Sequence, residues 1–325
     1  MKVFFLITVF FVLLISNSCA KNPPDLPEDT LISNEKVPLN DLRDKYYRGL
    51  QGGLYPNGSN SRPDRHNNAG IQIASEIRPL DENGNTSMQD GSIVWLSVGM
   101  SNTTQEASAF IQAAKTYQDI HPRLVLVDGA QGNWDIDMMN DPNASYWQNI
   151  SKRLNAAGLN EKQVQIIWFK QADRNFPDTS FMGYTQNFKN KLKASVQLLK
   201  SKYPNLKMCY LSSRIYAGYQ TGTGSNPEPY AYLTGWGVKF FIEDQINGNV
   251  ELAYSGKSPL VPWLSWGPYL WANGANPRSD GLKWIFPDDF QPDGIHPSTL
   301  GRKKVANQLL EFFTTDETSR IWFLK

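Results

Sequence analysis

Residues 92–117 read SIVWLSVGMSNTTQEASAFIQAAKTY, and this stretch decides the fold class. Its first eight residues form a short apolar run, which favours a buried strand. A turn of small and polar residues follows, and from residue 104 onward apolar side chains recur at helical spacing. A buried strand that leads directly into an amphipathic helix is typical of a βα unit.

The same order of apolar run and helix continues toward the C-terminus. Four further runs follow: RLVLVDG (123–129), VQIIWF (164–169), LKMCYLSS (206–213) and PLVPWLSW (259–266). Helical spacing returns over residues 184–202 and 301–314. Strands that alternate with helices pair in parallel, because each crossover returns the chain to the same edge. The sequence therefore predicts a doubly wound, mainly parallel five-stranded sheet with helices on both faces, a flavodoxin-like α/β fold.

The N-terminal residues predict export. An apolar run over residues 3–15 is too short to span a bilayer and is typical of a secretory signal peptide. It leads into Ser16-Asn17-Ser18-Cys19, which resembles a bacterial lipobox, where Cys19 would receive the lipid. The alternative is an ordinary signal peptide that is cleaved near Ala20. We expect a lipoprotein that is anchored in the bacterial cell envelope, at the periplasm or the cell surface.

The remaining chain is expected to form one domain behind a tether. Residues 20–40 are rich in proline and charge, which indicates a flexible tether. Residues 41–90 hold many Gly, Asn, Pro and Ser residues, so we expect loops with at most one helix and short strands. A hydrophobic content of 40% is enough for a single domain over residues 41–325.

Charge and cysteine content exclude several kinds of site. A net charge of +1 without a basic run gives no reason to expect a nucleic-acid partner. Apart from Cys19 the chain has only Cys209, so the domain has no internal disulfide. No cluster of His, Cys and carboxylate residues has metal-ligand spacing, and no glycine-rich loop resembles a phosphate cradle. We therefore predict neither a metal nor a cofactor.

Ser101 lies in the turn between the first predicted strand and its helix. A hydroxyl there stands above the carboxyl end of the sheet, close to the unpaired N–H groups of a helix start, where a nucleophile can act. Taken alone, such a serine is more often a helix cap. Thr103 and Glu106 have the spacing of a capping box, which predicts the start of the helix.

His296 lies three residues after Asp293 in the loop PDGIHP, directly before the last predicted helix. In this arrangement a carboxylate can orient the imidazole while the other ring nitrogen takes a proton from a serine. The alternative is a loop aspartate and a surface histidine. Of the other histidines, His121 precedes a strand and so lies at the wrong edge, and nothing in the sequence supports a role for His66 at the cleft rim.

A serine after the first strand and Asp-x-x-His before the last helix, in this order, resemble the SGNH (GDSL-type) hydrolase superfamily over residues 91–313. In that family a Gly-Asp-Ser block supplies the nucleophile, and two middle blocks supply a glycine N–H and an asparagine side chain. Here the first block reads Gly99-Met100-Ser101, with Met in place of Asp. The resemblance implies that Ser101 is the nucleophile, His296 the base and Asp293 its orienting carboxylate.

The resemblance also implies an oxyanion hole. The second block looks like DGAQGN (128–133), where Gly132 is the expected N–H donor and Gly129 the second choice, although glycines there can also serve only a tight turn. In the third block the family's asparagine position holds Ala172. Gln171 either supplies an amide donor in its place or has a structural role.

Three residues are expected near the substrate. Arg214 and Tyr216 follow the fourth predicted strand, and Trp266 lies in an aromatic run over residues 262–271. Arg214 could bind a substrate carboxylate, although a structural ion pair is favoured. The aromatic run would form one wall of a cleft, with at least half of its rings buried.

Together these features predict a monomeric serine esterase that removes an acyl group, for example acetyl, from a carbohydrate through an acyl-serine intermediate. The membrane would be contacted only through the lipid. A rival hypothesis from another class is a glycan-binding protein on an inactive hydrolase scaffold, because the first and third blocks are degenerate. A third hypothesis is catalysis on a thioester or an amide.

Overall fold

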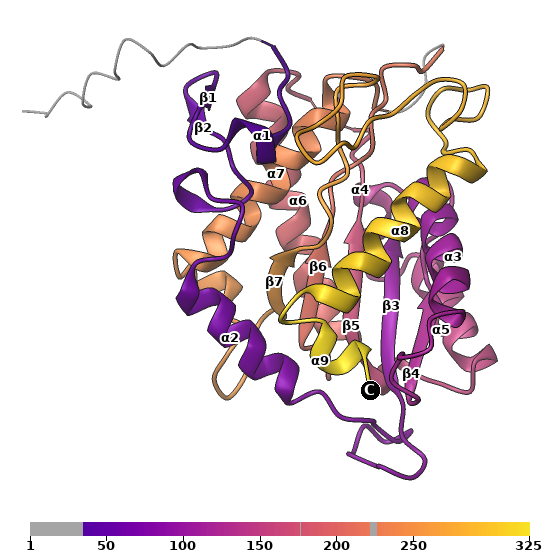
Figure 1. The fold of residues 1–325 in the computed structure, drawn as a ribbon. Helices are drawn as coiled ribbons and strands as arrows, with labels where there is room; N and C mark the ends of the chain where they lie inside the picture. The colour runs from indigo at the N-terminus through magenta and orange to yellow at the C-terminus, as the bar shows by residue number, and fades with distance from the viewer. Residues whose placement is uncertain (1–34, 176, 222–225) are drawn as a thin grey trace, which may run out of the picture. The chain divides into compact units, whose positions relative to one another are not determined.

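The computed structural model describes residues 35–175, 177–221 and 226–325 (Figure 1). They belong to one compact unit that spans Ile32–Lys325. The predicted signal peptide, Cys19 and residues 20–34 of the predicted tether lie outside the described residues.

Five parallel strands form the central sheet. They are β3 (Ile93–Gly99), β4 (Leu124–Asp128), β5 (Val164–Lys170), β6 (Met208–Leu211) and β7 (Trp263–Trp266). Their order is β4-β3-β5-β6-β7, and each neighbouring pair is parallel. This is the flavodoxin-like order, so the predicted fold class is confirmed. The chain reverses its direction across the sheet between β3 and β5, and ligands bind at the carboxyl ends of the strands at such a point.

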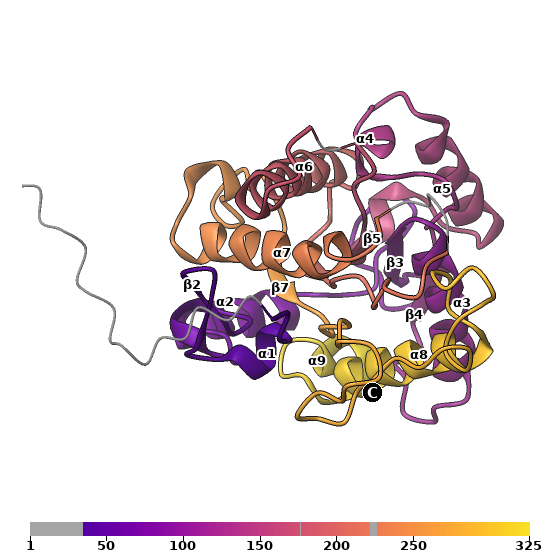
Figure 2. The ribbon, with the colours of Figure 1, turned by 90° about the horizontal axis from the view of Figure 1, so that it is seen from above.

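Helices cover both faces of the sheet (Figure 2). One layer holds α2 (Asp64–Ser75), α3 (Ser101–Lys115), α8 (Thr299–Thr315) and α9 (Arg320–Phe323). The other holds α1 (Leu39–Leu42), α4 (Ile136–Met139), α5 (Ser145–Ala156), α6 (Phe181–Lys202) and α7 (Tyr230–Ile246). Single 3-10 turns occur at η1 (Pro56–Gly58), η2 (Glu161–Gln163) and η3 (Val250–Leu252).

Alternation along the strands divides the core between the two layers. Trp95 of β3 packs with α3 and α8, where its ring lies 5.2 Å from Phe110 and 5.9 Å from Phe313. Its neighbours Val94 and Leu96 belong to the core on the opposite face. Because both faces are covered, the strands read as continuous apolar runs in the sequence.

The N-terminal segment is more ordered than the sequence predicts. It holds the hairpin of β1 (Tyr46–Tyr47) and β2 (Leu50–Gln51), the short helix α1, and the twelve-residue helix α2. Within residues 41–90, α2 is the one full α-helix and β1 and β2 are short strands, as predicted. The order goes beyond the prediction because α1 begins at Leu39, inside the predicted tether. His66 of α2 is buried, and its ring stacks on Trp263 at 5.0 Å. It lies in the core and not at a cleft rim.

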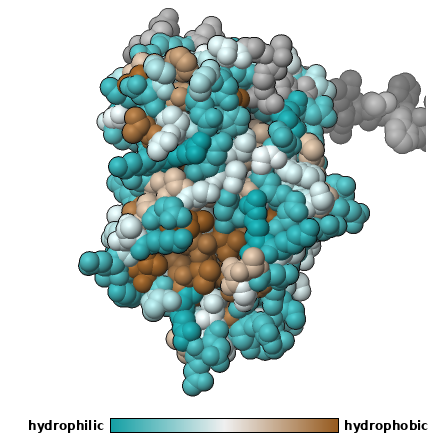
Figure 3. All heavy atoms as spheres, turned by 90° about the vertical axis from the view of Figure 1, so that its right-hand side faces the viewer, coloured by the Kyte–Doolittle hydropathy of each residue, from teal (hydrophilic) through white to brown (hydrophobic). Residues whose placement is uncertain are grey.

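The edge strand β4 leaves part of its apolar side chains accessible at the surface. Leu124, Val125 and Leu126 on the edge strand β4 are only half-buried, and Figure 3 shows an apolar area on the side that α3, α5 and β4 face.

Within the described residues no helix has the length and apolar character needed to cross a membrane. Cys209 of β6 is buried, and burial raises the pKa of its thiol.

Candidate active site

The turn between β3 and α3 places Ser101 above the sheet. Gly99 permits this turn, because a Cβ there would lie 2.1 Å from the carbonyl oxygen of Lys170. Ser101 is the first residue of α3, and no side chain caps the helix. The predicted capping box is wrong: Thr103 Oγ1 donates to the Lys170 carbonyl at 2.7 Å, and Glu106 pairs with the Lys170 side chain.

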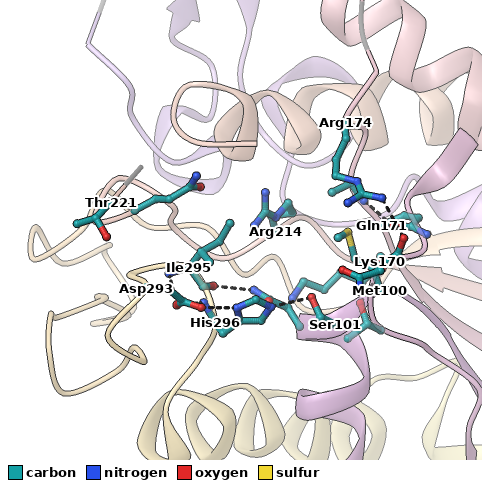
Figure 4. Close-up of a pocket in the computed structure, with 15 residues that line it drawn as sticks. Met100, Ser101, Lys170, Gln171, Arg174, Arg214, Thr221, Asp293, Ile295 and His296 are labelled. Atoms are coloured by element: carbon teal, nitrogen blue, oxygen red, sulfur yellow. Dashed lines mark hydrogen bonds and ion pairs between the residues drawn. The ribbon is translucent and has the colours of Figure 1, made fainter. Parts of the chain in front are cut away.

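Ser101, His296 and Asp293 lie within hydrogen-bond distance in one chain of contacts (Figure 4). Ser101 Oγ is 2.9 Å from His296 Nε2, although the residues are 195 positions apart in sequence. Asp293 Oδ2 is 2.6 Å from His296 Nδ1. When Nδ1 donates its proton to the carboxylate, Nε2 is left as the acceptor for the serine hydroxyl.

The loop that carries Asp293 and His296 is fixed by its own backbone. Asp293 Oδ1 accepts the N–H groups of Ile295 and His296, both at 3.0 Å. Partial burial opposes the charge of Asp293, but these N–H groups and the His296 ring outweigh it and lower the pKa of the carboxyl. Gly294 has a φ of 67°, and a Cβ there would lie 2.0 Å from the Tyr219 carbonyl, so the loop requires glycine.

Asn102 ties this loop to the helix that carries the serine. Its Nδ2 donates to the Ile295 carbonyl at 3.0 Å. The side chain is buried next to Ser101, so the bond joins the two halves of the site directly. The sequence analysis did not single out Asn102, and its position next to Ser101 was the only available signal.

Two backbone N–H groups, those of Gly132 and Ser101, are the candidate donors of an oxyanion hole. Gly132 lies close to the serine, since a Cβ at Gly132 would be 3.8 Å from Ser101 Cβ. Within the described residues neither the Gly132 N–H nor the Ser101 N–H has an acceptor. Gly129 is excluded as a donor because its N–H already donates to the Ser97 carbonyl at 3.1 Å. Of the two predicted glycines, the structure brings Gly132 to the serine.

Gln171 lines the same pocket, but its amide is occupied. Nε2 donates to the Trp134 carbonyl at 2.8 Å, and Oε1 accepts the Ala172 N–H at 2.8 Å. These bonds give Gln171 the structural role that was the alternative to an oxyanion donor. Asn133 also lines the pocket, and its exposed side chain bonds to no described residue. Sequence reasoning missed Asn133, although it directly follows Gly132.

The pocket around Ser101 has a volume of about 290 Å³. Arg214 lines it as expected, but Tyr216 and Trp266 do not. Tyr216 is half-buried and packs edge-on against Tyr219, with ring centroids 5.0 Å apart. Trp266 is buried, and its Nε1 donates to the Leu54 carbonyl at 2.7 Å. Their predicted contact with substrate is therefore wrong for this pocket, because packing in the aromatic core takes both rings away from it.

Charged side chains line the rest of the pocket. Lys170 is buried with Glu106 behind it, at 2.6 Å between Nζ and Oε1. Burial raises the pKa of Glu106 and lowers the pKa of Lys170, while their mutual attraction opposes both shifts. Arg174 contacts Asp135, with Nε 3.1 Å from Oδ2. The sequence analysis did not assign Lys170 or Arg174 to the pocket.

The arrangement suits nucleophilic catalysis by a serine. It contains a serine hydroxyl in contact with an oriented imidazole, and the Gly132 backbone lies close to the same serine. No group of three or more His, Cys, Asp or Glu side chains in residues 35–175, 177–221 and 226–325 is placed to hold a metal ion.

Comparisons with known proteins place no family name on the chain. No sequence-family description matches it, and no curated protein resembles it significantly in sequence. Twelve solved structures match, at low similarity. A protein from Bacteroides fragilis that is provisionally described as an acylhydrolase is 13% identical, with a TM-score of 0.37, over 77% of this chain and 97% of that one.

Two further structures have similar scores. The salicylyl-acyltransferase SsfX3 from a tetracycline biosynthetic pathway is 14% identical, with a TM-score of 0.34, over 70% of this chain and 55% of its own. An extracellular lipase from Streptomyces rimosus is 9% identical, with a TM-score of 0.33, over 68% of this chain and 99% of its own. These values are too low to assign an activity.

Proposed function

We propose that the protein is a serine-dependent ester hydrolase with Ser101 as nucleophile. One observation carries the proposal: Ser101 Oγ lies 2.9 Å from His296 Nε2, while Nδ1 of the same ring is held by Asp293 at 2.6 Å. A helix cap would not need a histidine, and a surface histidine would not meet a serine 195 residues away. The pattern of nucleophile, base and orienting carboxylate is that of a catalytic triad.

In the first half of the proposed reaction, Ser101 Oγ attacks the carbonyl carbon of the ester. The serine proton passes to His296 Nε2, and Asp293 stabilises the imidazolium that forms. The negative charge on the carbonyl oxygen is stabilised by the N–H groups of Ser101 and Gly132. When the carbon–oxygen bond to the alcohol breaks, His296 returns the proton to the leaving oxygen, and the acyl group remains on Ser101.

The second half removes the acyl group with water. His296 takes a proton from the water molecule while the water oxygen attacks the acyl carbon. The N–H groups of Ser101 and Gly132 again stabilise the oxyanion. The bond to Ser101 Oγ then breaks, and the proton on His296 returns to the serine. A carboxylic acid leaves, and the site is restored without any oxidant or reductant.

We propose an acyl ester on a carbohydrate as the substrate. The pocket volume of about 290 Å³ lies at the lower end of small-ligand pockets, roughly 300 Å³, which favours a short acyl group such as acetyl over a long chain. A predicted exported, tethered protein meets glycans of the envelope and its surroundings. Aromatic residues contribute less to this proposal than expected, because Tyr216 and Trp266 lie outside the pocket.

The test uses an alkyl fluorophosphonate, which labels activated serines, together with 4-nitrophenyl acetate. We expect labelling at Ser101, and Ser101→Ala should lower kcat by at least about 10³-fold because the nucleophile is lost. Ser201→Ala is the matched control, an exposed serine of α6 that should leave both readouts unchanged. If Ser101 stays unlabelled in the unmodified protein and Ser101→Ala leaves any slow ester turnover unchanged, the chain is better explained as a glycan-binding protein.

We also propose that the chain is anchored by lipid on Cys19. The support is the apolar run and the polar residues before this cysteine. Cys19→Ala should move the protein from the membrane fraction to the soluble fraction in a bacterial host. A protein that stays in the membrane fraction after this change would contradict the anchor while leaving the esterase proposal untouched.

A further inference from the structure

The wall of the pocket around Ser101 presents cations more than carboxylates. Lys170, Arg174 and Arg214 line it, and the only carboxylate among the described lining residues belongs to Asp293, which His296 engages. Glu106, which balances the charge of Lys170, is not part of the lining. A molecule in the pocket therefore meets N–H donors on charged groups, and such donors favour an anionic acceptor.

Arg214 is the most firmly placed of these cations. It follows β6 and is only 6% exposed. Its Nη1 donates to the Asn226 carbonyl at 2.8 Å, which fixes the plane of the guanidinium. A guanidinium carries five donors in a planar fork that matches the two oxygens of a carboxylate. Figure 4 shows Arg214 in the same pocket as Ser101 and His296.

The unpaired side-chain amide of Gln220 is a second, independent observation that favours a polar ligand in the pocket. It lines the pocket, and both its Nε2 and its Oε1 are buried without a hydrogen-bond partner among the described residues. A buried amide without partners is unfavourable, because its polar groups lose their hydrogen bonds to water, and such groups in a native structure call for an explanation. A ligand that accepts from Nε2 would remove part of this cost.

We infer that the ester taken by this pocket carries a carboxylate group, which is bound by the Arg214 guanidinium and the Gln220 amide. The inference rests on the proposed function and names the substrate class of the same site. Two kinds of ester contain this chemistry. The carboxylate can lie on the alcohol side, as in an acylated acidic sugar, or on the acyl side, as in the monoester of a dicarboxylic acid.

Two matched pairs of substrates separate these sources. The first pair is an acetylated methyl glucuronoside and the acetylated methyl glucoside, which differ only in the carboxylate of the sugar. The second pair is 4-nitrophenyl hydrogen succinate and 4-nitrophenyl butyrate, which differ in the carboxylate of the acyl group. We expect kcat/KM for the acidic member of one pair to exceed that of its neutral partner by roughly 10- to 100-fold. The reason is that the neutral substrate lacks the carboxylate and cannot make the charge-assisted hydrogen bonds.

Variants then assign the preference to the two residues. Arg214→Lys keeps the charge but loses the fork, and Gln220→Ala removes an amide that makes no bond in the described structure. Each should reduce the ratio of acidic to neutral kcat/KM by about tenfold or more. Arg123→Gln, a partly exposed arginine at the start of β4, and Gln308→Ala, a half-buried glutamine of α8, are the controls that should leave the ratio unchanged.

Binding to a catalytically silent protein keeps the test separate from the esterase proposal. Ser101→Ala is titrated with methyl glucuronoside, methyl glucoside, succinate and butyramide by calorimetry. Preferential binding of either acid that Gln220→Ala weakens supports the inference even if no ester is hydrolysed. Neutral and acidic substrates turned over equally, or a preference that both variants retain, would overturn it. Loss of all hydrolysis in the unmodified protein would instead count against the proposed function.

Discussion

The ring of His296 is held from both sides. Asp293 contacts Nδ1, and Ser101 contacts Nε2. The same carboxylate also accepts the N–H groups of Ile295 and His296, so one side chain sets both the loop and the orientation of the ring. Because these bonds favour the ionised carboxyl and lower its pKa, Asp293 stays charged throughout the neutral range.

Asp293→Asn should therefore reduce kcat strongly. An amide in this place can donate to Nδ1, which favours the ring tautomer that cannot accept the serine proton. We expect a loss of about 10³- to 10⁴-fold in kcat, measured with 4-nitrophenyl acetate, with little change in the unfolding midpoint. Asp288→Asn, an exposed neighbour of the same loop region, is the control. A loss below tenfold would contradict an orienting role for Asp293.

Asn133 is a candidate for a third donor to the proposed oxyanion hole. It follows Gly132, lines the pocket, and its backbone carbonyl is fixed by Arg174 Nη2 at 2.9 Å. Asn133→Ala should lower kcat by roughly 10²- to 10³-fold with a small effect on KM, as for other oxyanion donors. Asn83→Ala, in an exposed loop, is the control. An unchanged kcat would leave only the two backbone donors.

The predicted site residues that the structure brings together are those whose place follows from the order of elements along the chain. Ser101 lies between the end of β3 and the first turn of α3, and His296 lies in the loop just before α8, so their convergence could be anticipated. Which side-chain amide near the pocket is already occupied could not be anticipated. Gln171 and Asn133 both follow strands, and only the folded backbone shows that the Trp134 carbonyl and the Ala172 N–H occupy the amide of Gln171.

Among the secondary-structure elements, α3 and β5 are joined by a buried ion pair. Glu106 is completely buried and Lys170 nearly so, and their side chains meet directly beneath the pocket. The desolvation of the two charges offsets much of the free energy that their attraction provides. A single buried charge without its partner destabilises the fold far more. The pair is therefore best regarded as fixing the position of the β5 end, where Gln171 and Ala172 line the site.

Glu106→Gln should destabilise the fold by about 3–5 kcal/mol, because it leaves the ammonium of Lys170 buried without a counterion. The double change Glu106→Leu with Lys170→Met should recover most of this loss, since it removes both charges. Urea unfolding of the three proteins measures the difference. The surface pair of Lys193 and Glu251 is the comparison, where Glu251→Gln should cost no more than about 1 kcal/mol. Equal costs at both pairs would contradict this interpretation.

A regular apolar pattern made most of the predicted elements recognisable, but not every such pattern was used. The helix α5 was missed although its Tyr146, Trp147, Ile150 and Leu154 form a buried stripe. The five strands and the helices α3, α6 and α8 were predicted within a few residues, because their patterns repeat at the period of the element. α7 was missed, since buried residues surround it on nearly all sides and no stripe appears in its sequence. The short α1 was missed because four residues are too few to show any period.

At the scale of the whole molecule, the stability of the fold should depend on pH through His66. Burial lowers the pKa of this histidine to about 4, while its ring stacks on Trp263 and Nε2 donates to the Leu264 carbonyl at 2.7 Å. The unfolded chain takes up the proton near the ordinary pKa of about 6.5. As pH falls from 6.5 to 4, the unfolded state therefore binds more protons than the folded state, and the fold loses stability.

This linkage is worth about 3 kcal/mol across that window. The free energy of unfolding, measured in urea at pH 7 and pH 4, should fall by that much more in the unmodified protein than in His66→Gln. The glutamine keeps an N–H donor but cannot take up a proton. If the free energy of unfolding fell by the same amount between pH 7 and pH 4 in both proteins, His66 would not be the source of this pH dependence.

Because Cys209 is buried, a cysteine introduced at the surface could be labelled selectively with thiol reagents. In a version of the chain that starts after Cys19, maleimide and iodoacetamide reagents would find no reactive thiol in the described part of the protein. Thr221 is exposed and lines the pocket, so Thr221→Cys offers a place for a fluorescent dye at its mouth. Ligand entry could then be followed by fluorescence in the same Ser101→Ala background, one molecule at a time.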